Sequence, residues 1–217
     1  MIAMALSLLF FPLQNSHAAG NETDLSGFVD IFDGKTLDGW AKLTSYNDHG
    51  QWEVIDGSIA GDQWPAGEGG LLATKKMYSD YEVYAECKAD YPIDSGLFLR
   101  VQGDVLSYQV TIDYRPDGEV GAIYSPGGGG FLVHYPEGEK LWKKDEYNVV
   151  RARIEGQPAH IQVWINGTQV QDFTDTKVDG KYRVPATGYF GIQVHPGASW
   201  GKGNKVRFRK IMIKELD

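Results

Sequence analysis

Apolar and polar residues alternate with a period of two along most of the chain, and no stretch keeps a period of 3.6 residues. Such alternation predicts β-strands that bury one face. Clusters of Gly, Pro, Asn and Asp separate the alternating runs. Strands are predicted over residues 51–56, 80–90, 95–101, 106–113, 147–155, 160–165, 188–194 and 205–216. The pattern therefore predicts an all-β fold.

Two Gly-containing segments add detail to this pattern. Asn166-Gly167 divides the run 161–173, and both residues accept the positive φ of a type I′ turn, so a hairpin is predicted. The sequon at Asn166 is therefore interpreted as a turn rather than a glycosylation site. The run SPGGGG at 125–130 is followed by a strand-like segment, whereas a phosphate-binding loop needs a helix behind it. A loop beside a groove and a flexible connection are equally good interpretations of this run.

The second face of several strands carries an unusual mixture of residues. The segment 188–197 would bury Phe190, Ile192 and Val194, and its other side holds an aromatic, an amide and an imidazole. Three further strands show similar second faces, in contrast to the Lys, Glu and Ser of a typical solvated face. The residues expected there include Glu86, Arg100, Gln109, Asp113, Tyr189, Gln193 and His195. This mixture favours a carbohydrate cleft, and a merely solvated surface is the alternative.

The first residues have the pattern of a signal peptide. An apolar run from Ile2 to Leu13 precedes Ser16-His17-Ala18, a small-x-small cleavage pattern, and the run is too short to span a bilayer. We expect residues 1–19 to be removed on export, giving a soluble periplasmic or secreted protein without a membrane anchor. Residues 25–217 then suit one all-β domain.

The composition argues against some binding partners and against disulfide bonds as a source of stability. The net charge of −8 argues against nucleic acid or an anionic membrane as partner. The single cysteine, Cys87, cannot form an intrachain disulfide, so it is expected to pack as a small apolar residue. No metal-binding motif or cofactor site is visible, although a divalent metal held by residues from distant strands stays open.

The chain contains an ordered series of motifs that includes GFVDIFDGKTLDGW (27–40), DSGLFLR (94–100), YQVTIDY (108–114) and GYFGIQVH (188–195). In this order the motifs resemble one family, the 3-keto-disaccharide hydrolases, formerly a domain of unknown function. The resemblance covers about residues 27–217. It implies a concanavalin A-like jelly-roll sandwich of two antiparallel sheets with a concave ligand face.

The chain departs from the family pattern at three places. Asp94 stands where the family usually has Asn, and Gln109 stands where it typically has Glu. If that Glu is catalytic in relatives, this protein has shifted its substrate or become a binder. The segment after His195 is also longer than usual, so Trp200 is expected to add a wall to the groove.

The resemblance implies hydrolysis of glycosides whose sugar is oxidised to a ketone at C3. Such a ketone acidifies the hydrogen on C2, so a base can start an elimination of the C1 substituent, and water then adds. His195 and Asp113 are the candidates for proton transfer, with Glu86 as a second carboxylate. The candidates for substrate binding are Arg100, Gln109, Gln193, Tyr189, Tyr124 and Trp200.

Three other functions compete with this hypothesis. A non-catalytic, lectin-like carbohydrate-binding module is the main alternative, because the fold supports both. An endoglucanase of the related laminarin-degrading type ranks lower, since the motif Glu-x-Asp-x-x-Glu is absent. A purely structural envelope domain comes third. The sequence leaves open the parent sugar, linkage and anomer, the division between acid and base, and the oligomeric state.

Overall fold

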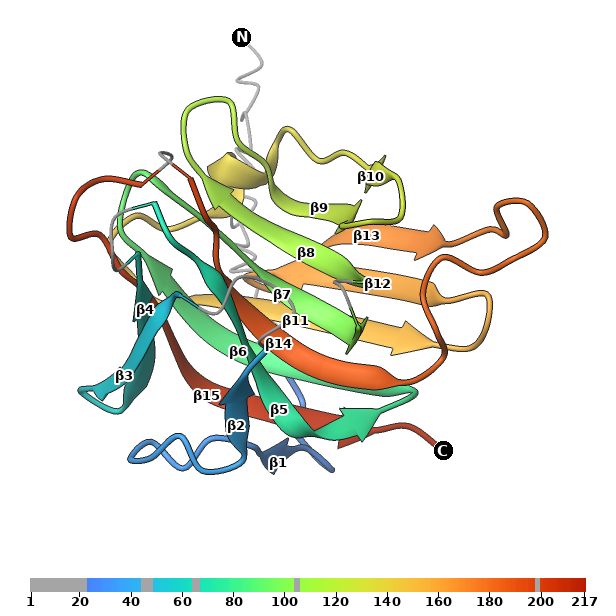
Figure 1. Cartoon of the computed structure of the whole chain (residues 1–217), viewed down its shortest axis with the longest axis horizontal. Helices are drawn as coiled ribbons and strands as arrows, with labels where there is room; N and C mark the ends of the chain where they lie inside the picture. The colour runs from blue at the N-terminus through green and yellow to red at the C-terminus, as the bar shows by residue number, and fades with distance from the viewer. Residues whose placement is uncertain (1–22, 44–48, 64–66, 104–105, 198–199) are drawn as a thin grey trace, which may run out of the picture.

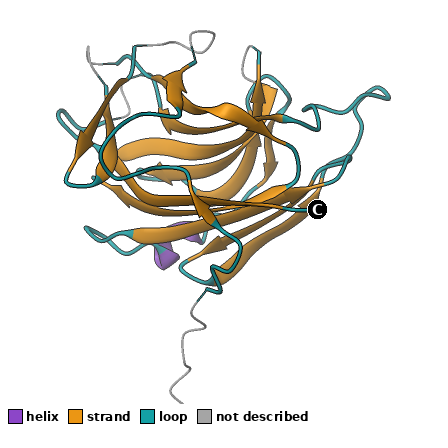
Figure 2. Cartoon of the chain, turned by 90° about the horizontal axis from the view of Figure 1, so that it is seen from below, coloured by secondary structure: helices purple, strands orange, loops and turns teal. Residues whose placement is uncertain are grey.

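A computed structural model describes most of the chain as two stacked antiparallel sheets, visible as two layers in Figure 2. Five segments lie outside the described part: residues 1–22, 44–48, 64–66, 104–105 and 198–199. The predicted signal peptide at 1–19 falls within the first of them and stays a prediction. Among the described residues, no helix is long and apolar enough to cross a membrane.

The back sheet contains eight strands of the described chain. These are β1 (Val29–Asp30), β3 (Gln51–Ile55), β4 (Ser58–Asp62), β6 (Tyr81–Ala89), β11 (Asn148–Glu155), β12 (His160–Ile165), β13 (Thr168–Thr174) and β15 (Val206–Glu215). Their order is β13-β12-β11-β6-β15-β4-β3, with β1 added beside β15 (Figure 1). Asn166 and Gly167 join β12 to β13 with φ values of 49° and 84°, which confirms the predicted hairpin.

The front sheet contains the other seven strands of the described chain. These are β2 (Trp40–Lys42), β5 (Gly70–Tyr78), β7 (Ile93–Gln102), β8 (Leu106–Tyr114), β9 (Val120–Ser125), β10 (Gly130–Val133) and β14 (Gly188–Val194). Their order is β10-β9-β8-β7-β14-β5-β2. A short 3-10 helix, η1 (Gly138–Leu141), lies between β10 and β11 in the sequence.

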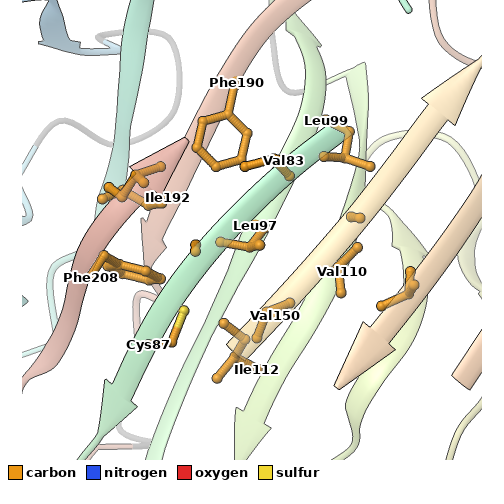
Figure 3. Close-up of a cluster of buried hydrophobic side chains, with 14 of the residues drawn as sticks. Val83, Cys87, Leu97, Leu99, Val110, Ile112, Val150, Phe190, Ile192 and Phe208 are labelled. Atoms are coloured by element: carbon orange, nitrogen blue, oxygen red, sulfur yellow. The ribbon is translucent and has the colours of Figure 1, made fainter. Parts of the chain in front are cut away.

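The core fills the space between the sheets, as Figure 3 shows. Leu97 and Val110 come from the front sheet and meet Val83, Val150 and other apolar side chains of the back sheet. Cys87 lies fully buried in this core, as predicted for a small apolar residue. This packing confirms the predicted jelly-roll sandwich, in which each sheet buries one face and turns the other outward.

The eight predicted strands all exist, and no strand end differs from its predicted position by more than two residues. Alternation did not reveal β5 and β9, because their buried stretches are apolar or small on both faces. The glycine-rich run at 125–130 forms the turn from β9 into β10. Pro126 and Gly127 line the cleft described below, which favours the loop beside a groove.

Candidate functional site

The outward face of the front sheet carries a row of polar side chains on three neighbouring strands. Asp94 on β7 is paired in register with Asp113 on β8, and Gly96 with Thr111. On the other side of β7 lies β14, which carries Gln193 and leads directly into His195. Several of these positions point away from the core and are nevertheless buried, among them Asp94, Gln109, Thr111 and Gln193. Polar side chains that are buried outside the core indicate a cleft.

The cleft has a volume of about 430 Å³, within the size range of small-molecule sites. It crosses the front sheet from β14 to β10. Its lining residues are Asp94, Gln109, Thr111, Asp113, Arg115, Tyr124, Pro126, Gly127, Phe131, Gln193 and His195. Five of the nine residues predicted for the site are therefore together: Asp113, His195, Gln109, Gln193 and Tyr124.

Arg115 connects two carboxyl groups at one end of the cleft. Its Nε and Nη2 donate to the two oxygens of Asp113 at 2.5 and 2.7 Å, and Nη2 lies 3.0 Å from Oδ2 of Asp94. Burial and the neighbouring charge of Asp113 raise the pKa of Asp94 to about 7, against the opposing effect of Arg115. Asp94 can therefore hold or release a proton near neutral pH.

His195 lies beside Asp94, with its ring in a defined tautomer. Nδ1 lies 2.6 Å from the carbonyl oxygen of Pro196, which can only accept, so Nδ1 carries the hydrogen. The lone pair is then on Nε2, which lies 3.7 Å from Oδ2 of Asp94. Burial is the main cause that lowers the pKa of His195, so the neutral ring is favoured. A neutral imidazole with Nε2 in the cleft is suited to accept a proton.

Backbone contacts fix the chain on both sides of this imidazole. The His195 N–H donates to the Asp94 carbonyl oxygen at 3.2 Å. Gln63 Nε2 donates to the carbonyl oxygens of His195 and Gly197 at 2.6 and 2.8 Å. These bonds set the position of His195 relative to β7, although the residue itself follows the end of β14.

Two amide side chains form the floor beside the charged end. Gln109 Nε2 donates to Gln193 Oε1 at 3.1 Å and reaches the Ser95 carbonyl oxygen at 3.3 Å. Gly96 leaves the space for this arrangement, because a Cβ there would lie 2.6 Å from Gln109 Nε2. Paired amides next to ionisable groups are suited to bind sugar hydroxyls.

Arg100 does not face the cleft, so the sequence prediction for this residue is wrong. Its side chain is fully buried and donates to the carbonyl oxygens of Ser79 and Gly156 at 2.7 and 3.0 Å, and to Asp80 at 2.6 Å. The β7–β8 register shifts between Leu99 and Gln102, and Arg100 has a φ of 54°. This bulge breaks the alternation on which the prediction depended.

Glu86 is also outside the cleft. It belongs to β6, in the back sheet, where Arg209 Nε donates to its Oε2 at 2.7 Å. Its residue parity was interpreted correctly as outward, but the outer face is that of the opposite sheet. Glu86 therefore cannot act as the second carboxylate of this cleft, and Asp94 takes that place.

Tyr189 and Trp200, which were also predicted for the site, do not line the cleft. Tyr189 packs against the small apolar cluster of Leu71, Phe98 and Val101. Trp200 is partly buried against the main core, so it does not provide the expected wall.

Sequence reasoning missed Asp94, Arg115 and Phe131. Asp94 had a signal, since it stands at a departure from the family pattern. Arg115 directly follows β8, and its long side chain reaches back to Asp113. The alternation of residue types along a strand does not predict such a contact. Within the described part of the chain, no group of three or more His, Cys, Asp or Glu side chains is arranged to hold a metal ion.

Comparison with a family model identifies the chain. Residues 27–214 match the model described as the 3-keto-alpha-glucoside-1,2-lyase-like domain. The chain belongs to this family. This match confirms the resemblance that was inferred from the sequence motifs.

Similarity to known proteins supports the membership of the chain in the 3-keto-alpha-glucoside-1,2-lyase-like family. A 3-keto-disaccharide hydrolase of Bacteroides thetaiotaomicron is 25% identical over 244 residues, which covers 89% of this chain and 80% of that protein. A candidate glycosyl hydrolase from Parabacteroides distasonis has a TM-score of 0.63 at 21% identity, covering 91% of this chain and 99% of the other. The family and the curated relative together support a glycoside hydrolase or lyase that has carbohydrate as its partner.

The same fold also occurs in a carbohydrate-binding module, CBM66 from Bacillus subtilis. Its TM-score is 0.60 at 15% identity, over 82% of this chain and 96% of the module. At this identity the likeness concerns the fold alone. The chemistry of the cleft must therefore distinguish an enzyme from a binding module.

Proposed function

We propose that the protein hydrolyses 3-keto-glycosides by elimination and hydration, using Asp94 and His195 for proton transfer. The observation that carries this proposal is the pair itself: a buried carboxyl group and an imidazole of fixed tautomer lie 3.7 Å apart in one cleft. The Asp113–Arg115 ion pair lies beside them. An elimination needs a base, an acid and a cation near the developing oxyanion, and these groups supply all three.

The first step removes the hydrogen on C2 of the keto-sugar. His195 Nε2 takes this proton, and the electron pair of the C2–H bond forms the C2–C3 double bond of an enolate. Negative charge then develops on the C3 oxygen. The Arg115 guanidinium, held by both carboxyl groups, is the cation positioned to stabilise that charge.

The second step breaks the bond between C1 and the leaving oxygen. The enolate returns its electron pair to form a double bond between C1 and C2, which restores the C3 ketone. Protonated Asp94 gives its proton to the departing oxygen. A pKa near 7, set by burial and by Asp113, keeps that proton available at neutral pH.

Hydration then reverses the proton transfers on the enone. Water attacks C1 and loses a proton to the Asp94 carboxylate, while His195 returns a proton to C2. The sum is hydrolysis of the glycosidic bond, and both side chains regain their starting states. Gln109 and Gln193 would hold the sugar hydroxyls during these steps.

Two of the three departures from the family pattern, Asp94 and Gln109, lie in this same cleft. Gln109 lacks the carboxylate that the family typically carries there, and Asp94 supplies one where the family usually has an amide. The side chain of Gln109 extends over Gly96, two residues from Asp94. Asp94 therefore replaces, beside Asp113, the carboxyl group that is lost at Gln109, which supports catalysis over simple binding.

Turnover of a panel of 3-keto-glucosides by the wild type and three variants tests the proposal. We expect Asp94→Asn and His195→Ala each to lower kcat by ~10²–10⁴-fold, the usual scale for loss of a general acid or base. Glu86→Gln is the matched control, since it makes the same kind of change on the opposite sheet and should stay within about twofold of wild type. Glycan binding by the wild type without turnover of any keto-glycoside would instead favour the binding module.

A further inference from the structure

The far end of the cleft holds an aromatic side chain to which the proposed chemistry assigns no role. Phe131, on β10, lines the cleft and is 42% exposed. β10 lies three places from β7 in the front sheet, so their backbones are separated by ~14 Å. This distance leaves room for a second sugar ring beyond the one at Asp94.

Neighbouring rings fix the orientation of Phe131. Its ring stacks on His134 at a centroid distance of 4.5 Å and an angle of 22°, and it meets Tyr124 edge-on at 5.2 Å and 78°. His134 is in turn held by Glu119, whose Oε1 lies 2.7 Å from His134 Nδ1. An aromatic ring supported from behind loses little freedom when a ligand covers its open face.

The support of Phe131 is continuous with the charged end of the cleft. The second carboxylate oxygen of Glu119 accepts the Tyr135 N–H at 2.5 Å. The Glu119 carbonyl oxygen accepts the Thr111 hydroxyl at 2.7 Å and the Asp113 N–H at 3.2 Å. One residue thus connects the aromatic end to the strand that carries Asp113.

We propose that Phe131, supported by His134 and Tyr124, binds the leaving sugar of a 3-keto-disaccharide. The Phe131 ring packs against the C–H face of that sugar. This inference rests on the proposed function for the identity of the ligand. The cleft gives the two ends different chemistry: amides and ionisable groups surround the oxidised ring, and an aromatic face contacts the ring that departs. Pyranose C–H faces pack on aromatic rings, whereas a small leaving group such as methanol would not reach Phe131.

Comparison of two substrates in the same enzyme tests this subsite. For Phe131→Ala, we expect kcat/KM on a 3-keto-disaccharide to fall by about tenfold, the scale of one aromatic contact. The value on the methyl 3-keto-glucoside should change by less than about twofold. Phe131→Tyr should keep most of the activity on both. Tyr91→Ala, which removes another similarly exposed aromatic outside the cleft, is the matched control. An equal loss on both substrates, or no loss on the disaccharide, would overturn the proposal.

A binding measurement separates this inference from the proposed reaction. If the wild type turns over no keto-glycoside, the proposed function fails, and calorimetric titration with an unoxidised glucose disaccharide and with methyl glucoside then decides the subsite. Tighter binding of the disaccharide, lost in Phe131→Ala, supports the subsite. No difference between the two sugars, or the same difference in the variant, contradicts it.

Discussion

At the scale of single residues, Asp94 shows how burial sets the chemistry of a carboxyl group. Arg115 lies within 3.0 Å of it and favours the ionised form. Burial and the charge of Asp113 act in the opposite direction and raise its pKa to about 7. Arg115 makes its two shorter hydrogen bonds to Asp113 and lies farther from Asp94. The result is two carboxyl groups in one cleft with different roles.

This raised pKa predicts a pH dependence of stability. In the folded state Asp94 binds its proton up to about pH 7, whereas in the unfolded chain it loses it near its ordinary value of 3.8. The folded state therefore holds more protons between these values, and the free energy of unfolding falls as pH rises from about 4 to 7. Asp94→Asn has no carboxyl group at this position, so its free energy of unfolding should not show this fall. Urea denaturation should show the variant gaining about 2–4 kcal/mol relative to wild type over that range.

Parallel pH profiles of the two proteins would contradict this assignment. The groups that face Asp94 are Asp113 and Arg115 from β8 and the turn after it, and His195 after β14. All three are present in both proteins, so the difference between the profiles reports mainly on Asp94.

Arg100 shows where residue-level reasoning from the sequence failed. Strand parity placed it beside Asp113, and its charge made it an attractive ligand for an oxyanion. The bulge between Leu99 and Gln102 turns it inward, where two backbone carbonyl oxygens and Asp80 accept its hydrogen bonds. A single irregular residue in a strand leaves no mark in an alternation pattern.

The structure predicts that Arg100 contributes to stability rather than to turnover. Arg100→Ala would leave the Ser79 and Gly156 carbonyl oxygens without this donor and should lower the free energy of unfolding by ~3 kcal/mol. Chemical denaturation measures this loss. At a temperature where the variant is folded, its kcat should remain within a few-fold of wild type. A stable but inactive Arg100→Ala protein would return this residue to the catalytic site.

At the scale of strands, two glycines lie on the outward face of the front sheet and differ in their structural roles. Gly96 on β7 gives space to the side chain of Gln109, since a Cβ there would lie 2.6 Å from Nε2 and 2.9 Å from the Val110 carbonyl oxygen. Gly191 on β14 has its nearest neighbours at 3.6 Å, an ordinary contact distance. Only the first glycine is required by the cleft.

This contrast predicts different outcomes for the same substitution. Gly96→Ala should displace Gln109, break its bond to Gln193 and lower kcat/KM by at least tenfold, because the amide floor moves. Gly191→Ala should change kcat/KM by less than about threefold. Steady-state kinetics on one 3-keto-glycoside measures both. If the two variants behave alike, the position of Gln109 does not matter to the reaction.

The strands themselves were largely predictable, for a physical reason. A strand with one face in the core and one outside must alternate, so β6, β8, β11 and β14 could be recognised from residue type. β5 begins with five buried residues in succession, and this removes the alternating signal. Such strands are visible only when their partners are known.

At the scale of the whole molecule, the sandwich determines which polar residues can cooperate. Both sheets present outward faces with the same sequence signature, so Glu86 and Asp113 could not be assigned to different sides from the sequence. Strand order resolves this, because β7, β8 and β14 are neighbours in the front sheet while β6 lies in the back sheet. Gln109, Asp113, Gln193 and His195 could be placed together from parity, because Gln109 and Asp113 share one face of β8 and Gln193 and His195 share one face of the segment that β14 begins.

Hydrolysis of a 3-keto-disaccharide in D₂O tests the central claim most directly. In the proposed reaction His195 takes the hydrogen from C2, exchanges it with solvent and returns a deuteron to C2 during hydration. The released 3-keto-sugar should therefore carry deuterium at C2, which NMR detects. A parallel incubation of the free 3-keto-sugar without enzyme measures spontaneous exchange. Product whose deuterium content at C2 is no higher than in that control would indicate direct displacement at C1 and contradict the roles assigned here to His195 and Asp94.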